Sequence, residues 1–157
     1  MDTKHKHRCW GKLVLEPIFH DELPEVEVCL DDIRLFYGGL DSKKTLEFDE
    51  KLPVGPHQLT VRFLNKKDQD TVVEKGLDKA VIIESVSFVG IESQRFVWSG
   101  IYTPQYPEPW YSQQSSPPPA ELPSHTYLSW NGVWKLNFTS PIFTWIHQIE
   151  GMGWIYD

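Results

Sequence analysis

The stretch His57-Gln-Leu-Thr-Val-Arg-Phe-Leu64 has the clearest pattern in this sequence. Apolar and polar residues alternate along it, with Leu59, Val61 and Phe63 on one side and Gln58, Thr60 and Arg62 on the other. A period of two places successive side chains on opposite faces of a β-strand. The stretch therefore predicts a strand that buries one face in a core and turns the other face to water.

Shorter stretches on both sides of this strand have the same character. Strands are predicted at 26–30, 33–35, 46–48 and 80–89. Asp31-Asp32 forms a turn between the first two, and Leu52-Pro-Val-Gly-Pro56 breaks the chain before the quoted strand. Helical spacing is nowhere sustained before residue 140. Short strands without intervening helices predict an all-β fold, an antiparallel β-sandwich of the jelly-roll type.

The composition limits the function. A chain of 157 residues with 40% apolar residues suits one compact domain. The formal net charge of −7 disfavours nucleic acid and anionic lipid as partners. No apolar run approaches the roughly 20 residues that cross a bilayer, and the polar start is not a standard signal peptide. Cys9 and Cys29 match no metal or redox motif, so we expect both to be reduced.

The order of the strands resembles a known family. The matching stretches are Val28-x-Leu30-Asp-Asp, Thr45-Leu-Glu-Phe48, Leu52-Pro-x-Gly55-x-His57-x-Leu59-x-Val61-x-Phe63-x-Asn65 and Asp78-x-Ala-Val-Ile-Ile. Over about residues 25–91, this order resembles the calcium-dependent xylan-binding type of carbohydrate-binding module. The resemblance implies a jelly-roll sandwich. It also implies a binding loop in which an Asn-Asp pair follows one strand and Asp-Arg-Asn precedes the next.

The loop itself departs from that family pattern. Asn65 and Asp78 match the family Asn and Asp, whereas Lys66 replaces the Asp of the pair, and Lys79 and Ala80 replace Arg and Asn. Calcium needs several oxygen ligands around one point. The candidate calcium ligands are Asn65, Asp68, Asp70 and Asp78. The alternative is a solvated, charged loop that holds no cofactor.

Aromatic residues are concentrated late in the chain. Of the 21 aromatic residues, 13 lie between Trp98 and Tyr156, where Lys135 is the only Lys or Arg. Seven of the twelve prolines lie within 104–123, which predicts an extended segment there. We therefore divide the chain into a sandwich at 1–102, an extended Pro- and aromatic-rich segment at 103–125, and a C-terminal part at 126–157.

The C-terminal part predicts a β-hairpin followed by one short α-helix. Asn131-Gly132 separates two alternating runs and is a strong signal for a two-residue hairpin turn. Ser140-Pro141 then predicts a helix start, and Gly151 predicts its end. Apolar residues recur between them with helical spacing, at Ile142, Trp145, Ile146 and Ile149.

Two uses of the aromatic residues are predicted. Trp and Tyr rings can stack on sugars, and the candidate glycan-binding residues are Trp98, Tyr102, Tyr106, Trp110 and Tyr111. Large aromatics with few charges also favour a protein interface, for which the candidates are Trp130, Trp134, Phe143, Trp145 and Trp154. The C-terminal part then packs either on the sandwich or on a partner chain.

The sequence favours a non-catalytic function. It has no Gly-x-Ser-x-Gly motif and no phosphate-binding motif. The C-terminal part contains Tyr127-Leu-Ser-Trp-Asn-Gly-Val-Trp134, Pro141-Ile-Phe-x-Trp-Ile-His-Gln148 and Gly153-Trp-Ile-Tyr156. With these stretches it also looks similar to the C-terminal portions of small structural proteins of marine tailed bacteriophages. That resemblance implies a capsid- or tail-associated virion component, assembled in the host cytoplasm, that adheres to surfaces and contacts other virion proteins or itself. The alternative is a free-standing calcium-dependent module that binds a cell-surface glycan.

Overall fold

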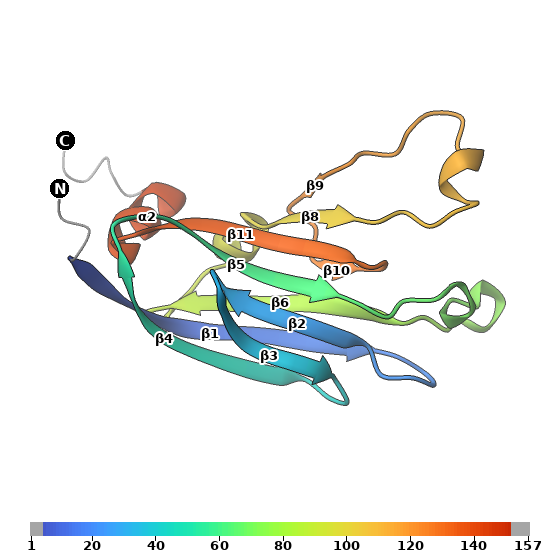
Figure 1. The fold of residues 1–157 in the computed structure, drawn as a ribbon, viewed down its shortest axis with the longest axis horizontal. Helices are drawn as coiled ribbons and strands as arrows, with labels where there is room; N and C mark the ends of the chain where they lie inside the picture. Colours follow the sequence, from blue (N-terminus) through green and yellow to red (C-terminus); the bar gives the residue numbers. More distant parts are fainter. Residues whose placement is uncertain (1–4, 152–157) are drawn as a thin grey trace.

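Two antiparallel β-sheets face each other in the computed structural model, which describes residues 5–151 (Figure 1). The five-stranded sheet has the order β10-β6-β1-β4, with β7 paired to β6. Its strands are β1 (Lys6–Ile18), β4 (Lys44–Pro53), β6 (Ala80–Phe88), β7 (Ile91–Glu92) and β10 (Tyr127–Leu128). The predicted antiparallel β-sandwich is confirmed.

The six-stranded sheet has the order β3-β2-β5-β11-β8-β9. Its strands are β2 (Glu25–Leu30), β3 (Ile33–Gly39), β5 (Gly55–Phe63), β8 (Ile101–Pro104), β9 (Leu122–Pro123) and β11 (Gly132–Ser140). The helices are α1 (Gln94–Trp98), α2 (Ile142–Glu150) and the single 3₁₀ turns η1 (Asp68–Asp70), η2 (Val73–Lys75) and η3 (Tyr111–Gln113). Within residues 5–151, no helix is long and apolar enough to cross a membrane.

The core lies between the inner faces of the sheets. On β5, Leu59, Val61 and Phe63 are at most 1% exposed, as their alternation predicts. β1 is also internal, because it pairs with β4 on one side and β6 on the other. β1 lies within the sandwich predicted at 1–102, but none of the strands predicted there covers it, although Leu13 and Leu15 alternate into the core.

The predicted hairpin across Asn131-Gly132 is wrong. β10 pairs with β6 in the five-stranded sheet, whereas β11 pairs with β5 and β8 in the six-stranded sheet. The chain therefore crosses between the sheets at this point. Gly132 is needed because a β-carbon there would lie 2.4 Å from the Thr103 carbonyl oxygen, and not because it occupies a two-residue turn.

One end of the sandwich is covered by the two α-helices. α2 follows its predicted bounds and ends at Gly151, whose φ of 65° is the left-handed conformation that glycine favours. Trp145 on α2 contacts the rings of three core residues, Phe88, Phe96 and Phe138. α1 was missed, because five residues are too few to establish a helical period.

Two of the predicted interface residues belong to the core instead. Trp134 is 0% exposed, and Trp145 is 5% exposed, so neither ring is available to a partner chain. The interface prediction is wrong for both, because their strand and helix pack within this chain. Phe143 is 58% exposed, and Trp154 lies outside the described residues.

Candidate functional site

A groove of about 530 Å³ is lined by residues of several loops. Figure 1 shows the two longest of these loops extending from the same end of the sandwich. Three connections form the groove: the β5–β6 loop (64–79), the β8–β9 loop (105–121) and the short β10–β11 crossover (129–131). Its lining residues are Lys66, Asp68, Thr71, Val73, Asp78, Pro107, Glu108, Pro109, Trp110, Gln113, Ser129 and Trp130. We call this the loop-end groove. It brings together residues that the sequence predicted for two separate roles.

The β8–β9 loop supplies an aromatic cluster. The rings of Tyr106 and Tyr111 stack with centroids 5.8 Å apart, and the Trp110 ring lies 5.5 Å from that of Tyr106. The Tyr106 hydroxyl donates a 2.6 Å hydrogen bond to the Pro119 carbonyl and so ties the two limbs of the loop together. Trp110 stays 44% exposed on this support, so an exposed indole is held at the groove.

The β5–β6 loop supplies the charged part of the groove. Lys66 is buried, and its side chain is 1% exposed. Its ammonium donates to Asp78 Oδ1 at 2.7 Å and to the Lys79 carbonyl at 2.6 Å, and it lies 5.3 Å from the centre of the Trp130 ring. The cation–π contact orients Trp130 beside the groove.

Both carboxylate oxygens of Asp78 accept hydrogen bonds from other residues of the protein. Its Oδ1 accepts hydrogen bonds from Lys66, from the Thr71 hydroxyl at 2.7 Å and from the Lys79 amide at 2.8 Å. Its Oδ2 accepts from the Tyr127 hydroxyl at 2.6 Å. Burial raises the pKa of the Asp78 carboxyl, but the hydrogen bonds outweigh burial and leave the pKa below its usual value.

A second buried lysine lies beneath the same loop. The Lys79 ammonium contacts Glu22 Oε1 at 2.8 Å, Asp70 Oδ2 at 3.0 Å and the Asn65 carbonyl at 3.0 Å. Burial lowers the pKa of Lys79, but the bonds to the two carboxylates outweigh burial and raise it overall. The loop is therefore held by the side chains of two buried lysines.

These contacts do not fit a calcium ion. Asn65 Oδ1 accepts from the Glu25 amide at 2.8 Å, and both Asp70 and Asp78 are paired with ammonium groups. Of the four predicted ligands, only Asp68 has an uncommitted carboxylate. Residues 5–151 contain no group of three or more His, Cys, Asp or Glu side chains arranged for a metal. Asn65, Asp70 and Asp78 are already bonded to N–H or ammonium groups of this chain, so they do not form the set of free oxygen ligands that calcium needs.

The predicted glycan-binding residues divide into three places. Tyr106, Trp110 and Tyr111 form the cluster beside the groove. Tyr102 is 1% exposed, and its hydroxyl donates to the Trp130 carbonyl, so its prediction as a sugar-facing ring is wrong. Trp98 is 52% exposed at the end of α1, outside the groove lining.

Sequence reasoning missed several groove residues. Thr71, Gln113 and Ser129 lie in loops and follow no motif. Lys66 appeared in the sequence only as a departure from a family pattern, and it is the residue that joins Asp78 to Trp130. The available signal was the pair Lys66-Lys67 between Asn65 and the two aspartates of Asp68-Gln-Asp70.

Comparisons with known proteins give little beyond architecture. No family model and no curated protein matches the chain. One similar solved structure is the selenomethionine form of vCBM60, from work on two families of calcium-dependent carbohydrate-binding modules. It has a TM-score of 0.48 and 10% identity, and the match covers 82% of this chain and 89% of that one.

A second similar structure is vCBM60 in complex with galactobiose, with a TM-score of 0.47 and 12% identity. That match covers 82% of this chain and 98% of the other. Neither value places the chain in a family. Neither description names a virus, so the expected virion role gains no support.

Proposed function

We propose that this protein binds carbohydrate, without catalysis, in the loop-end groove. The observation that carries the proposal is an exposed indole, Trp110, lining the same groove as hydrogen-bonding groups on a second loop. A sugar ring has an apolar C–H face and a rim of hydroxyls. An aromatic face beside fixed polar groups complements both parts.

Each wall has a distinct task. Trp110 offers a face for stacking, supported from behind by Tyr106. Asp68 and Thr71 supply acceptors to sugar hydroxyls from the other loop, because the Thr71 O–H already donates to Asp78, and Ser129 adds a hydroxyl from the crossover that can donate and accept. The groove volume of about 530 Å³ lies within the range of about 300–1,000 Å³ that small-molecule sites occupy.

The state of Asp78 favours binding over hydrolysis. A glycosidase needs one carboxylic acid that is protonated near neutral pH. Asp78 is held ionised by the Lys66 ammonium, the Thr71 hydroxyl and the Tyr127 hydroxyl. Its oxygens are committed to the protein, so we assign Asp78 a positioning role.

Lys66 and Lys79 are also the reason that we propose no calcium cofactor for this site. Their ammonium groups supply the positive charge that the acidic loop needs, so saccharide binding proceeds without calcium. This differs from the calcium-dependent module that the sequence resemblance implies.

Two exposed tryptophans provide a matched test. Trp110 is 44% exposed in the groove, and Trp98 is 52% exposed outside it. We would screen the protein on a glycan array and then measure the affinity of Trp110→Ala and Trp98→Ala for the best neutral oligosaccharide by calorimetry. We expect Trp110→Ala to weaken binding about tenfold or more, which corresponds to roughly 1.4 kcal/mol, and Trp98→Ala to leave it within about twofold.

Two results would reject this function. One is a wild-type protein that binds no glycan on the array. The other is an equal loss of affinity in the two tryptophan variants, which would indicate a general effect of removing an exposed indole.

A further inference from the structure

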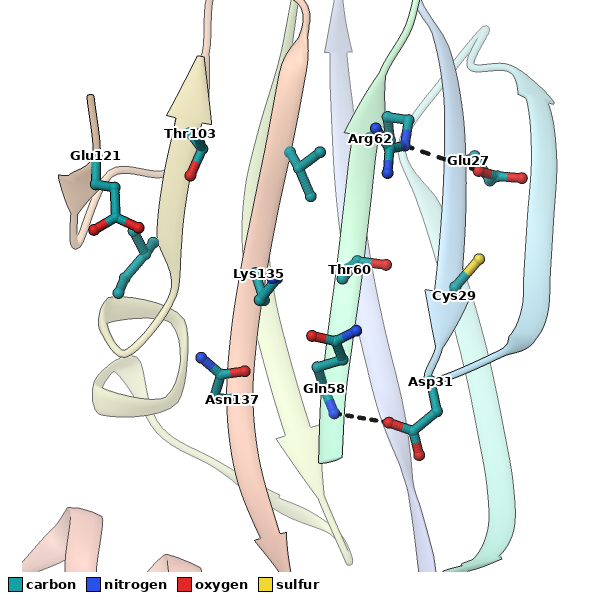
Figure 2. A pocket seen from close by; sticks show the side chains of 12 residues that line it. Glu27, Cys29, Asp31, Gln58, Thr60, Arg62, Thr103, Glu121, Lys135 and Asn137 are labelled. Atoms are coloured by element: carbon teal, nitrogen blue, oxygen red, sulfur yellow. Dashed lines mark hydrogen bonds and ion pairs between the residues drawn. The ribbon is translucent and has the colours of Figure 1, made fainter. Parts of the chain in front are cut away.

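A second groove, of about 500 Å³, crosses the outer face of the six-stranded sheet (Figure 2). It shares no lining residue with the loop-end groove. Its lining residues are Glu27, Cys29, Asp31, Gln58, Thr60, Arg62, Ile101, Thr103, Glu121, Val133, Lys135 and Asn137. We call it the sheet-face groove.

The strand register arranges these residues in rows across the sheet. Lys135 on β11 is opposite Thr60 on β5, and Asn137 is opposite Gln58. The Thr60–Lys135 row continues into both flanking strands, since Thr60 is opposite Cys29 on β2 and Lys135 is opposite Ile101 on β8. Neighbouring strands lie about 4.8 Å apart, so each row places one polar group of β5 beside one of β11 in the direction perpendicular to the strands.

The central groups of this groove have no protein partner. Among residues 5–151, none forms a hydrogen bond or ion pair with the side chains of Gln58, Thr60, Lys135 or Asn137. Figure 2 shows these four side chains projecting from the same face of adjacent strands. Two amides, a hydroxyl and an ammonium are therefore free to bond with a ligand.

The flanks of the groove are fixed. Glu27 is paired with Arg34 at 2.8 Å and lies 4.0 Å from Arg62. Asp31 accepts a 2.9 Å hydrogen bond from the Gln58 backbone N–H and lies 2.7 Å from His57 Nδ1. Glu27 and Asp31, on the β2 side, are therefore bonded within the protein, whereas Glu121 on the opposite side of the groove has no partner among residues 5–151.

The outer face of the five-stranded sheet differs in its ion pairs. Three pairs join charged side chains there, Arg8–Asp49 at 2.8 Å, Lys12–Glu47 at 3.8 Å and Lys43–Glu84 at 2.8 Å, although Thr45 and Lys51 on the same face have no partner among residues 5–151. Outward-facing residues on an antiparallel sheet are polar by default. The centre of the sheet-face groove differs in that no ion pair joins β5 to β11 there.

We infer that the sheet-face groove is a second saccharide site, which binds a neutral oligosaccharide lying across β5 and β11. The inference rests on the proposed carbohydrate-binding function and extends it. The groove has no aromatic lining residue, so the sugar is held by hydrogen bonds to its hydroxyls and not by stacking. Both signs of charge line the groove, and this favours a neutral chain over an anionic one.

The side-chain amides of Gln58 and Asn137 give NMR signals from the groove itself, so binding there can be observed directly. The protein, labelled with ¹⁵N, would be titrated with xylohexaose, cellohexaose and mannohexaose, with a hexamer of galacturonic acid as the charged comparison. We expect one neutral probe to shift both the Trp110 indole resonance and the side-chain amide resonances of Gln58 and Asn137, with two binding events per protein.

A variant of the exposed residues Lys135→Ala/Asn137→Ala should weaken the second event at least tenfold and leave the Trp110 shift unchanged. The matched control is Lys12→Ala/Thr45→Ala, two exposed residues on the five-stranded sheet, which should change neither event. Shifts at Trp110 without shifts at Gln58 and Asn137 would overturn the second site and leave the proposed function standing. Binding of no probe at all would overturn both.

Discussion

Two lysine side chains, Lys66 and Lys79, lie almost entirely out of water, with 1% of each side chain exposed. Removing an ammonium from water costs several kcal/mol unless it is paired and hydrogen-bonded. Both lysines meet that requirement, because each contacts a carboxylate and a backbone carbonyl. Their position explains how a loop that contains Asp68, Asp70 and Asp78 keeps one shape.

Removing the Lys66 ammonium should therefore destabilise the protein. We expect Lys66→Met to lower the free energy of unfolding by about 3 kcal/mol, the lower end for a broken buried pair, because Asp78 remains a quarter exposed. Urea denaturation would measure the change. The control is Lys67→Met, whose side chain is 51% exposed and whose loss should cost less than about 1 kcal/mol. Equal stability of the two variants would show that Lys66 does not anchor the loop.

At the scale of elements, α2 shows what the C-terminal aromatic residues do within the described chain. The helix places Trp145 against three phenylalanine rings from β6, α1 and β11. The edge-to-face and tilted arrangements are those that aromatic rings prefer. The helix therefore covers one end of the sandwich, and Figure 1 shows the β5–β6 and β8–β9 loops, whose residues line the loop-end groove, extending from the other end.

Two substitutions on α2 compare the loss of a buried ring with the loss of an exposed ring. We expect Trp145→Ala to cost about 3–5 kcal/mol of stability, since it leaves a cavity among buried rings. Phe143→Ala on the same helix should cost less than about 1 kcal/mol, because that ring is 58% exposed. Melting temperatures and denaturant midpoints would measure both. An unchanged midpoint for Trp145→Ala would contradict the packing of α2 on the sandwich.

At the scale of the whole molecule, the sandwich is a rigid frame with polar grooves in two places. One groove is built from loops that extend beyond the strands, and the other from the strand register itself. Strands fix side chains more firmly than loops do, so the sheet-face groove depends on the fold alone. The loop-end groove depends in addition on the lysine–carboxylate contacts.

This arrangement predicts that calcium has no effect on the folded protein. We expect EDTA to leave the melting temperature within about 1 °C and to leave saccharide affinity unchanged, because the ammonium groups already neutralise the loop. Calorimetry with EDTA and then with excess CaCl₂ would check this. A fall in melting temperature that calcium restores would contradict the assignment of Lys66 and Lys79 as the internal cations.

The alternation of apolar and polar residues determined the sandwich. Each strand carries its own period of two, so β2, β5 and β6 were predictable from local sequence, and so was α2 from its helical period. The crowding of Tyr106, Trp110 and Tyr111 in a proline-rich segment likewise identified the aromatic cluster. These features depend on neighbours in sequence.

Only the tertiary structure decided which strands pair and which side chains meet. Asn131-Gly132 has the sequence of a hairpin turn. However, β10 pairs with β6, whereas β11 pairs with β5 and β8, so the two strands belong to different sheets. In the same way, Trp110 and Asp68 line one groove only because two loops leave the same end of the sandwich. Strand pairing joins residues that are far apart in the chain. Which strands pair therefore cannot be predicted from the pattern of neighbouring residues.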